Sequence, residues 1–345
     1  MTAPSNILVI YTGGTIGMIR DYQSDALHPF DFGQLYEQFP VLKQQNFIID
    51  CISFDPIVDS SNMNPVKWIE LATIIEENYE KYDGFIVLHG SDTMAYSASA
   101  LSFILENLNK PVIFTGSQLP LGVFRTDGRE NFITSVEIAS AHIDDTPVVP
   151  EVAILFENKL LRGNRTIKFN AENFQAFRSV NYPVLAEAGV HIIYNHNYIL
   201  KPNFKKLKVH RNLDTNIAIL KLFPGIGRNT VDAILNIPGL KAIILETFGT
   251  GNAPTDPWLL DSFRQAMARG IIILNVTQCK VGFVEMGKYQ TSVELKKIGV
   301  IGGYDITTES AVAKLMYLLG EYTREQTIEL LHVSLRGEIT LNPVN

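Results

Sequence analysis

Short apolar runs alternate with longer amphipathic segments along most of the chain. In the first half, apolar runs predict strands at residues 7–11, 47–52, 85–88, 112–114 and 152–156. The last three are continuously apolar, which is typical of strands that are covered on both faces. Strands that alternate with helices predict a parallel sheet with helical crossovers, and we therefore expect an α/β fold.

Two crossover helices are expected between these strands. Apolar side chains recur at helical spacing over 66–79, directly after Asn64-Pro65, and a capping residue followed by proline is typical of a helix start. A second helix is predicted over 97–108, with its apolar face formed by Leu101, Ile104, Leu105 and Leu108.

The pattern weakens near 182–211 and then resumes. We interpret 193–212 as a linker, in which the Lys and Arg side chains form a solvated connector. Beyond it, strands are predicted at 217–223, 242–245 and 271–276, with helices near 229–236 and 257–269. The expected architecture is a larger N-terminal parallel-sheet domain, 1–192, and a smaller C-terminal α/β domain, 213–345.

Composition agrees with two folded domains and narrows the range of partners. Of 345 residues, 46% are hydrophobic and 19% are charged, which supplies a large core. The chain has 29 Lys and Arg against 36 Asp and Glu, a net charge of −7. Because phosphate backbones and anionic lipids attract basic surfaces, we expect neither nucleic acid nor a membrane as partner.

The cysteine pattern and the N-terminal sequence indicate a reducing compartment. Cys51 and Cys279 are too few for a disulfide framework, and neither lies in a cluster with metal-ligand spacing. No basic, apolar leader is recognised, and no apolar run reaches the ~18 to 20 residues of a membrane helix. We expect a cytoplasmic protein without a bound metal.

The first strand leads into a glycine-rich turn, Thr12-Gly13-Gly14-Thr15-Ile16-Gly17. Paired glycines let a backbone turn sharply and approach a ligand, and Thr15 is left as the side chain able to act as a nucleophile or a donor. A nucleotide-binding turn is the alternative. It is disfavoured because the spacing is not G-x-G-x-x-G and because no acidic residue ends the second strand.

Other predicted strands also end in small polar residues. The third ends in His89-Gly90-Ser91-Asp92, where a carboxylate can take an ammonium group and a hydroxyl can position a water; capping of the following helix is the alternative. The segments Asp59-Ser60-Ser61 and Thr115-Gly116-Ser117 add polar groups at the same edge. Carboxyl ends of parallel strands meet at one edge, so we expect one ligand site there.

A threonine nucleophile needs an activating group. No histidine lies in a zinc or nucleophile-elbow motif, and His89 is interpreted as a packed loop residue. Lysine is the usual substitute for histidine. Lys168 follows the strand at 152–156, and repulsion from Arg162 and Arg165 would favour its neutral amine. An ordinary surface lysine is the alternative.

Together these segments resemble the bacterial-type L-asparaginases, most closely their cytoplasmic type I branch. The matching motifs occur in the family's order and span nearly the whole chain. They are Tyr11-Thr12-Gly13-Gly14-Thr15-Ile16-Gly17, Asp59-Ser60-Ser61, Leu88-His89-Gly90-Ser91-Asp92-Thr93-Met94, Phe114-Thr115-Gly116-Ser117-Gln118, Arg162-Gly163-Asn164-Arg165-Thr166 and Gly249-Thr250-Gly251-Asn252-Ala253-Pro254.

The resemblance implies hydrolysis of L-asparagine, with L-glutamine as a second candidate substrate, through an acyl-threonine and without metal or cofactor. It implies that Thr15 is the nucleophile and that Ser91, Asp92 and Lys168 help to activate it or a water. Tyr22 is the implied lid tyrosine. The implied substrate-binding residues are Asp59, Ser60, Ser61, Ser91, Asp92 and Ser117. The N-terminal domain of one subunit and the C-terminal domain of another would form each site, in a homodimer or homotetramer.

Three positions depart from the family's pattern. Ser91 replaces the usual threonine, which removes a methyl group that restricts the rotamer. Leu27-His28-Pro29 stands where the lid tyrosine is usual, so Tyr22 is only the nearest tyrosine. Glu246 stands where some relatives have an arginine for a regulatory asparagine. An amidotransferase subunit and a non-catalytic ligand-binding module are the alternative functions.

Overall fold

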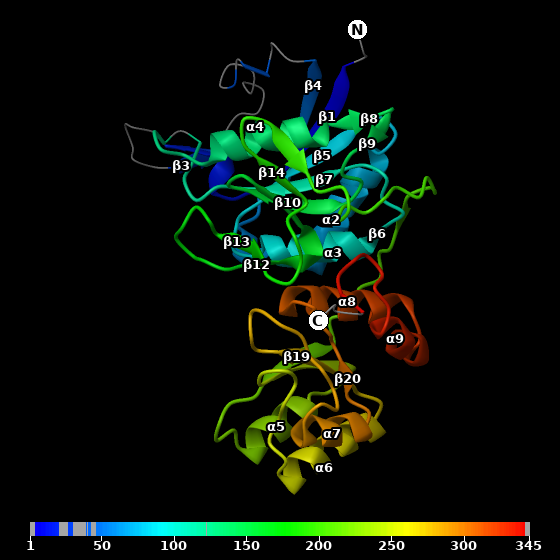
Figure 1. Ribbon diagram of the computed structural model, residues 1–345. Coiled ribbons are helices and arrows are strands. Elements are labelled where there is room, and N and C mark those ends of the chain that lie inside the picture. The colour runs from blue at the N-terminus through cyan, green and yellow to red at the C-terminus, as the bar shows by residue number, and fades with distance from the viewer. Residues whose placement is uncertain are drawn as a thin grey trace. The chain divides into compact units, whose positions relative to one another are not determined.

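The computed structural model describes residues 4–20, 27–29, 39, 41, 42, 46–121 and 123–341. The chain divides into two compact units, Met1–Val209 and His210–Asn345. Each unit has its own sheet and its own hydrophobic core (Figure 1).

The N-terminal unit is built on an eight-stranded sheet with the order β15-β14-β11-β10-β7-β5-β1-β4. Its parallel part contains all five predicted strands, which are β1 (Ser5–Tyr11), β4 (Phe47–Ser53), β5 (Gly84–Leu88), β7 (Val112–Thr115) and β10 (Val152–Phe156). The sheet continues in three antiparallel strands that the sequence pattern did not predict, which are β11 (Lys159–Arg162), β14 (Ala186–Ala188) and β15 (Ile192–Tyr194).

Helices cover both faces of this sheet. Helix α4 (Gly128–Ala139) lies on one face, and α2 (Pro65–Glu77) and α3 (Met94–Ile104) lie on the other (Figure 1). Phe132 and Val136 of α4 pack in one core cluster with Val9 and Ile86 of the strands. Alternate strand residues face the two helical layers, which explains why these strands are apolar throughout.

The start of α2 follows the prediction, and the end of α3 does not. Asn64 caps α2, because its Oδ1 accepts hydrogen bonds from the N–H groups of Val66 at 3.0 Å and Lys67 at 3.2 Å. Helix α3 begins at Met94 and ends at Ile104 instead of 108. The next residues form β6 (Leu105–Glu106), which pairs with β16 (Lys208–Val209), and this long-range pairing overrides the local helical pattern.

Short two-stranded ribbons complete the N-terminal unit. They pair β2 (Met18–Arg20) with β3 (Leu27–Pro29), β8 (His142–Ile143) with β9 (Thr146–Pro147), and β12 (Thr166–Lys168) with β13 (Phe177–Ser179). The predicted linker, 193–212, includes the end of β15 and all of β16. Within it, the N–H of Asn203 donates to Asn109 Oδ1 at 2.9 Å.

The C-terminal unit contains a four-stranded parallel sheet in the order β17-β18-β19-β20. The strands are β17 (Ile217–Lys221), β18 (Ala242–Thr247), β19 (Ile272–Thr277) and β20 (Ile301–Gly302). The helices are α5 (Arg228–Leu235), α6 (Pro257–Ala268), α7 (Gln290–Lys297), α8 (Thr308–Glu321) and α9 (Arg324–Leu331). The predicted elements of this unit are present, while β20 and α7 to α9 were not predicted.

Both cysteines have free thiols. Cys51 is half-buried on β4, and burial, with the nearby charge of Asp50, raises the pKa of its thiol to about 12. Cys279 is exposed. Within the described part of the chain, none of the helices has the length and apolar character that crossing a membrane requires.

Candidate active site

Three loops meet at the carboxyl edge of the N-terminal sheet. The N–H of Thr12 donates to Leu88 O at 3.0 Å, and the N–H of Val58 donates to Thr12 O at 2.7 Å. A Cβ atom placed on Gly14 would lie 2.5 Å from Gly90 Cα, so the first and third loops are in backbone contact. The turn that carries Thr15 therefore lies directly beside the segment that carries Ser91.

Thr15 begins a short 3-10 helix, Thr15–Gly17, and its side chain is half-buried. Gly14, which precedes it, has φ +94°, a backbone conformation that glycine adopts without a Cβ penalty. The Tyr11 hydroxyl donates to Gly14 O at 3.2 Å and helps to fix the turn. The threonine is thus presented on a tightly determined loop.

Lys168 joins this edge from β12. Its Nζ donates to Ser91 Oγ at 2.9 Å and to Asp92 Oδ1 at 2.5 Å, across 77 and 76 residues of chain. The lysine side chain is 18% exposed and that of Asp92 is 66% exposed. An ion pair with one exposed partner adds little to stability. Its effect here is to hold the lysine amine beside the serine hydroxyl. The structure therefore brings Lys168, Ser91 and Asp92 together beside the Thr15 turn.

Asp59, Ser60 and Ser61 lie at the same edge. Asp59 Oδ1 accepts hydrogen bonds from the N–H of Ser61 at 2.8 Å and from Ser61 Oγ at 2.7 Å. These hydrogen bonds hold the pKa of Asp59 below its usual range. Ser60 is buried, and its Oγ would lie 2.5 Å from a Cβ on Gly90, so this loop packs against the loop of Ser91.

Thr93 is a site-organising residue that sequence reasoning did not single out. Its Oγ1 donates to Ser60 O at 2.6 Å and so links the loop of Ser91 to the loop of Ser60. Its position in the sequence could have indicated this role, because Thr93 directly follows the polar Ser91-Asp92 pair. A backbone carbonyl partner, however, leaves no mark in a sequence.

Ser117 lies in the fourth loop and is buried. Its Oγ donates to Leu119 O at 2.6 Å, so the hydroxyl serves the conformation of its own turn. The neighbouring Gly116 lies close to His89, since a Cβ there would be 2.5 Å from His89 O. This loop therefore lies at the same edge, and its serine side chain is hydrogen-bonded within the loop itself.

The structure changes the expectation for Arg162, and it does not describe Tyr22. Arg162 does not act as an uncompensated charge on Lys168, because its Nε donates to Glu151 Oε2 at 2.6 Å and both side chains are buried. The expected repulsion from Arg162 was therefore wrong: a carboxylate eleven residues upstream neutralises it. Tyr22, the predicted lid tyrosine, lies outside the described residues.

Glu246 belongs to the C-terminal unit, at β18. Its Oε1 accepts a hydrogen bond from Thr308 Oγ1 at 2.8 Å, and its Oε2 lies 3.4 Å from Lys221 Nζ. The carboxylate is therefore paired within this unit.

No group of three or more His, Cys, Asp or Glu side chains suited to a metal is found among the residues that the structure describes.

His89 is packed as expected, and its ring Nδ1 lies 2.6 Å from Gly90 O. Burial lowers its pKa to about 4, and Nε2 has no hydrogen-bond partner in the described structure. Because the unfolded chain takes up this proton near pH 6.5 and the folded chain only near pH 4, stability contributed by neutral His89 is complete above about pH 6.5 and falls as the pH drops.

We expect the free energy of unfolding to drop by about 2 kcal/mol more in the parent protein than in His89→Asn between pH 7.5 and pH 5. The Nδ2 of asparagine can replace the Nδ1 donor, but asparagine does not titrate. Urea unfolding at the two pH values measures the difference. Equal pH dependence in the two proteins would contradict the conclusion that buried, neutral His89 makes stability depend on pH.

The contact between Gly14 and Gly90 can be tested with a matched glycine. Gly225 also has a positive φ, +89°, but a Cβ there would meet nothing within 4 Å. We expect Gly225→Ala to lose about 1 to 2 kcal/mol of stability through its positive φ alone, and Gly14→Ala to lose more, because its Cβ would also clash with the Gly90 backbone. Only Gly14→Ala should also lower catalytic turnover, by about 100-fold, because the threonine turn is displaced. Equal turnover in both variants would argue against this contact as a determinant of the site.

Comparison with known proteins accounts for both units. Residues 6–200 match the family model "Asparaginase, N-terminal", and residues 216–331 match "Glutaminase/Asparaginase C-terminal domain". The chain is 42% identical over 342 residues to L-asparaginase 1 of Escherichia coli, covering 97% of this chain and 98% of that protein.

Two further matches differ in how much of the other protein they cover. The chain is 39% identical over 359 residues to the 60 kDa lysophospholipase of Mus musculus, covering 97% of this chain but 62% of that protein. The crystal structure of L-asparaginase I from Vibrio cholerae superposes with a TM-score of 0.88 at 41% identity, covering 98% of this chain and all of that one.

Proposed function

The chain belongs to the asparaginase family, and we propose that it hydrolyses L-asparagine to L-aspartate and ammonia. One observation carries the proposal beyond family membership. Lys168 Nζ contacts both Ser91 Oγ and Asp92 Oδ1, and their loop is in backbone contact with the turn of Thr15. A hydroxyl nucleophile, a second hydroxyl, a carboxylate and an amine are the groups that amide hydrolysis needs.

In the proposed reaction, Thr15 Oγ forms a bond to the side-chain amide carbon and gives up its proton. The C–N bond then breaks, and nitrogen leaves with that proton as ammonia, which leaves an ester between threonine and the aspartyl group. Water adds to this ester, and the threonine proton is restored as L-aspartate departs. Ser91 and Lys168 relay protons to and from the reacting atoms.

Substrate binding is proposed to follow the charges of an amino acid. Asp92 takes the α-ammonium group, while Ser60 and Ser61 donate to the α-carboxylate. Asp59 orders this binding loop through its two hydrogen bonds to Ser61, and Ser117 belongs to the adjoining wall. The hydrogen-bonded Asp59 is thus a positioning residue for the serines.

Ammonia release by the purified full-length protein tests the proposal. We expect saturable release from L-asparagine, and a lower kcat/KM for L-glutamine, whose extra methylene changes the fit by about 1 to 3 kcal/mol. Rates for both amides over a wide concentration range also reveal any sigmoidal response. Absence of ammonia release from either amide would refute the proposal.

We further propose a cytoplasmic homo-oligomer, a dimer or a tetramer, with a catalytic domain at 1–192, a linker at 193–212 and a second domain at 213–345. The two free thiols are consistent with a reducing compartment. The oligomer rests on the family resemblance, in which a neighbouring subunit completes the site. Sedimentation velocity and cell fractionation test these two points.

A further inference from the structure

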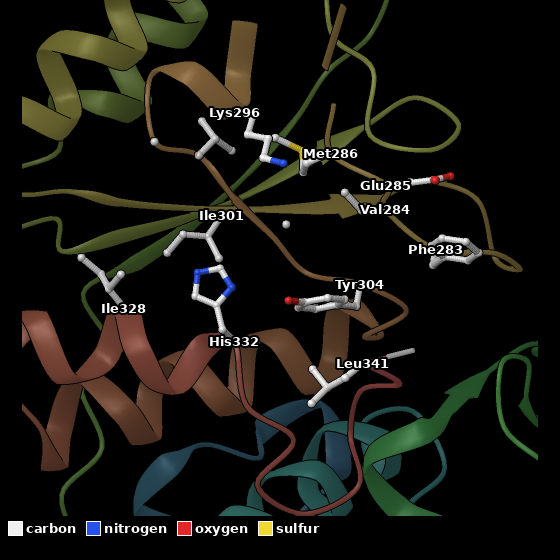
Figure 2. Close-up of a pocket in the computed structure, with 13 residues that line it drawn as sticks. Phe283, Val284, Glu285, Met286, Lys296, Ile301, Tyr304, Ile328, His332 and Leu341 are labelled. Carbon is white, nitrogen blue, oxygen red and sulfur yellow. The ribbon is translucent and has the colours of Figure 1, made fainter. Parts of the chain in front are cut away.

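A cavity of about 720 Å³ lies in the C-terminal unit, and its lining comes entirely from residues 283–341 (Figure 2). This volume is typical of small-molecule sites. Strand β20 is the edge of the four-stranded sheet, and Ile301 and Gly302 present that edge to the cavity. None of the residues assigned above to amide hydrolysis contributes to the lining.

The walls are mainly apolar, with three polar side chains among them. Met286 and Ile301 line the cavity together with Lys296, Tyr304 and His332. In Figure 2, Lys296 lies beside Met286, and the Tyr304 hydroxyl points toward His332. Within the described residues, the side chains of these three polar residues have no hydrogen-bond partner. They are free to bind a ligand.

The charge of the cavity favours an anion. Lys296 lies in the last turn of α7 and has no acidic partner in the part of the chain that the structure describes. Glu285 also lines the cavity, but its carboxylate pairs with Lys288 at 2.8 Å and points away from the cavity in Figure 2. The uncompensated charge at the cavity is therefore that of Lys296.

Tyr304 is held in a backbone conformation that is unusual for a bulky residue. Its φ is +57°, in the left-handed region that favours glycine. Its carbonyl accepts a hydrogen bond from the N–H of Val284 at 2.8 Å, and the preceding Gly303 donates to Asn275 O at 2.8 Å. These backbone bonds fix the strained residue and set its ring at the cavity. Strained residues of this kind concentrate at ligand sites.

From these observations we propose that the C-terminal unit binds a small carboxylic acid that carries an aromatic ring. The carboxylate pairs with Lys296, and the ring packs against Tyr304, Met286 and Ile301. Aromatic rings and methionine sulfur make favourable contacts with such a ring. This is a second ligand site, separate from the amide-hydrolysing one.

Phenylacetate is the probe, and calorimetric titration of the full-length protein is the measurement. We expect saturable binding at one site per chain, and binding of 2-phenylethanol that is weaker by about 3-fold to 5-fold, because it lacks the charge that pairs with Lys296. Saturating L-aspartate should leave phenylacetate binding unchanged. Hydrogen exchange should slow at 296–304 and not at 91–92 or 168. Competition by aspartate, protection near Ser91, or no binding would each overturn the proposal.

Two adjacent lysines supply the matched control. Both lysines are exposed, but Lys297 pairs with Glu294 at 2.8 Å, while Lys296 has no acidic partner among the residues that the structure describes. We expect Lys296→Met to weaken phenylacetate binding by about 3-fold to 5-fold, and Lys297→Met to change it less than about 2-fold. Equal effects would show that general surface charge attracts the anion, which overturns the assigned contact.

Tyr304→Gly separates binding from folding. Glycine adopts the positive φ without strain and keeps the backbone bond to Val284, so the thermal midpoint should not fall. The variant should nevertheless lose phenylacetate binding, because the ring is gone. Unaltered binding in a folded Tyr304→Gly protein would overturn the role of this ring. Amide turnover is expected to be unchanged in all three variants, so failure here is distinguishable from failure of the proposed hydrolysis.

Discussion

Thr15→Ala is expected to lower kcat for L-asparagine by about 10³-fold to 10⁴-fold, the scale seen when a covalent nucleophile is removed. The substitution removes the oxygen that would form the ester and leaves Gly14 and the turn unchanged. Because the other substrate-binding residues remain, KM should change much less than kcat. Steady-state ammonia release, with quench analysis for a covalent aspartyl-protein in the parent, measures both effects.

Lys168→Met should give a loss of kcat of similar order, because Ser91 and Asp92 lose the ammonium group that joins them. Lys81→Met is the matched control, since Lys81 forms an exposed pair with Asp50 at 3.2 Å. The Lys81 pair is exposed, so Lys81→Met should change stability by less than about 1 kcal/mol and leave turnover unchanged. Full turnover in Thr15→Ala or in Lys168→Met would remove the proposed mechanism.

The second large effect concerns a buried ion pair in the C-terminal unit. Lys314 Nζ lies 2.6 Å from Glu338 Oε1, and the exposed fractions of the two side chains are 1% and 0%. Glu338 also accepts hydrogen bonds from the N–H groups of Leu335 and Arg336. Lys314→Met should therefore destabilise the unit by about 3 to 5 kcal/mol, because it leaves an uncompensated buried carboxylate.

An exposed pair of the same length is the control. Arg264 Nη1 lies 2.6 Å from Asp261 Oδ1, and Arg264→Met should cost less than about 1 kcal/mol. Urea unfolding in a Trp68→Phe background reports this unit through Trp258, the other tryptophan of the chain. A second substitution, Glu338→Leu, should recover only part of the loss in Lys314→Met, because it removes the unpaired carboxylate but leaves the N–H groups of Leu335 and Arg336 without their acceptor. Equal costs for the Lys314 and Arg264 substitutions would contradict this account of the buried pair.

The parallel strands were predictable because burial on both faces makes them continuously apolar. Strand β10, Val152–Phe156, matches its prediction at both ends. Helix α4, Gly128–Ala139, was not predicted, although its buried Phe132, Val136 and Ala139 stand at helical spacing. Strands β14 and β15 were missed because each has only three residues, and their pairing depends on distant partners rather than on local pattern.

The site was predictable in outline for a topological reason. Parallel strands put the loops of Thr15 and Ser91 at one edge, so their residue types could be grouped without coordinates. The contact of Lys168 with Ser91 depends on the β12–β13 ribbon, which has no local signal in the sequence. The pairing of Arg162 with Glu151 was equally hidden, since charge pairing across strands requires the register of the sheet.

The separation of Lys168 from Ser91 along the chain has a consequence for biosynthesis. A nascent polypeptide that has been synthesised only through β10 already contains the threonine turn and the serine loop, but Lys168, the cation that joins Ser91 to Asp92, has yet to be translated. Premature termination before codon 168 thus yields a fragment that lacks this amine. The three-residue contact of Lys168, Ser91 and Asp92 can therefore form only after the parallel strands of the first sheet have been synthesised.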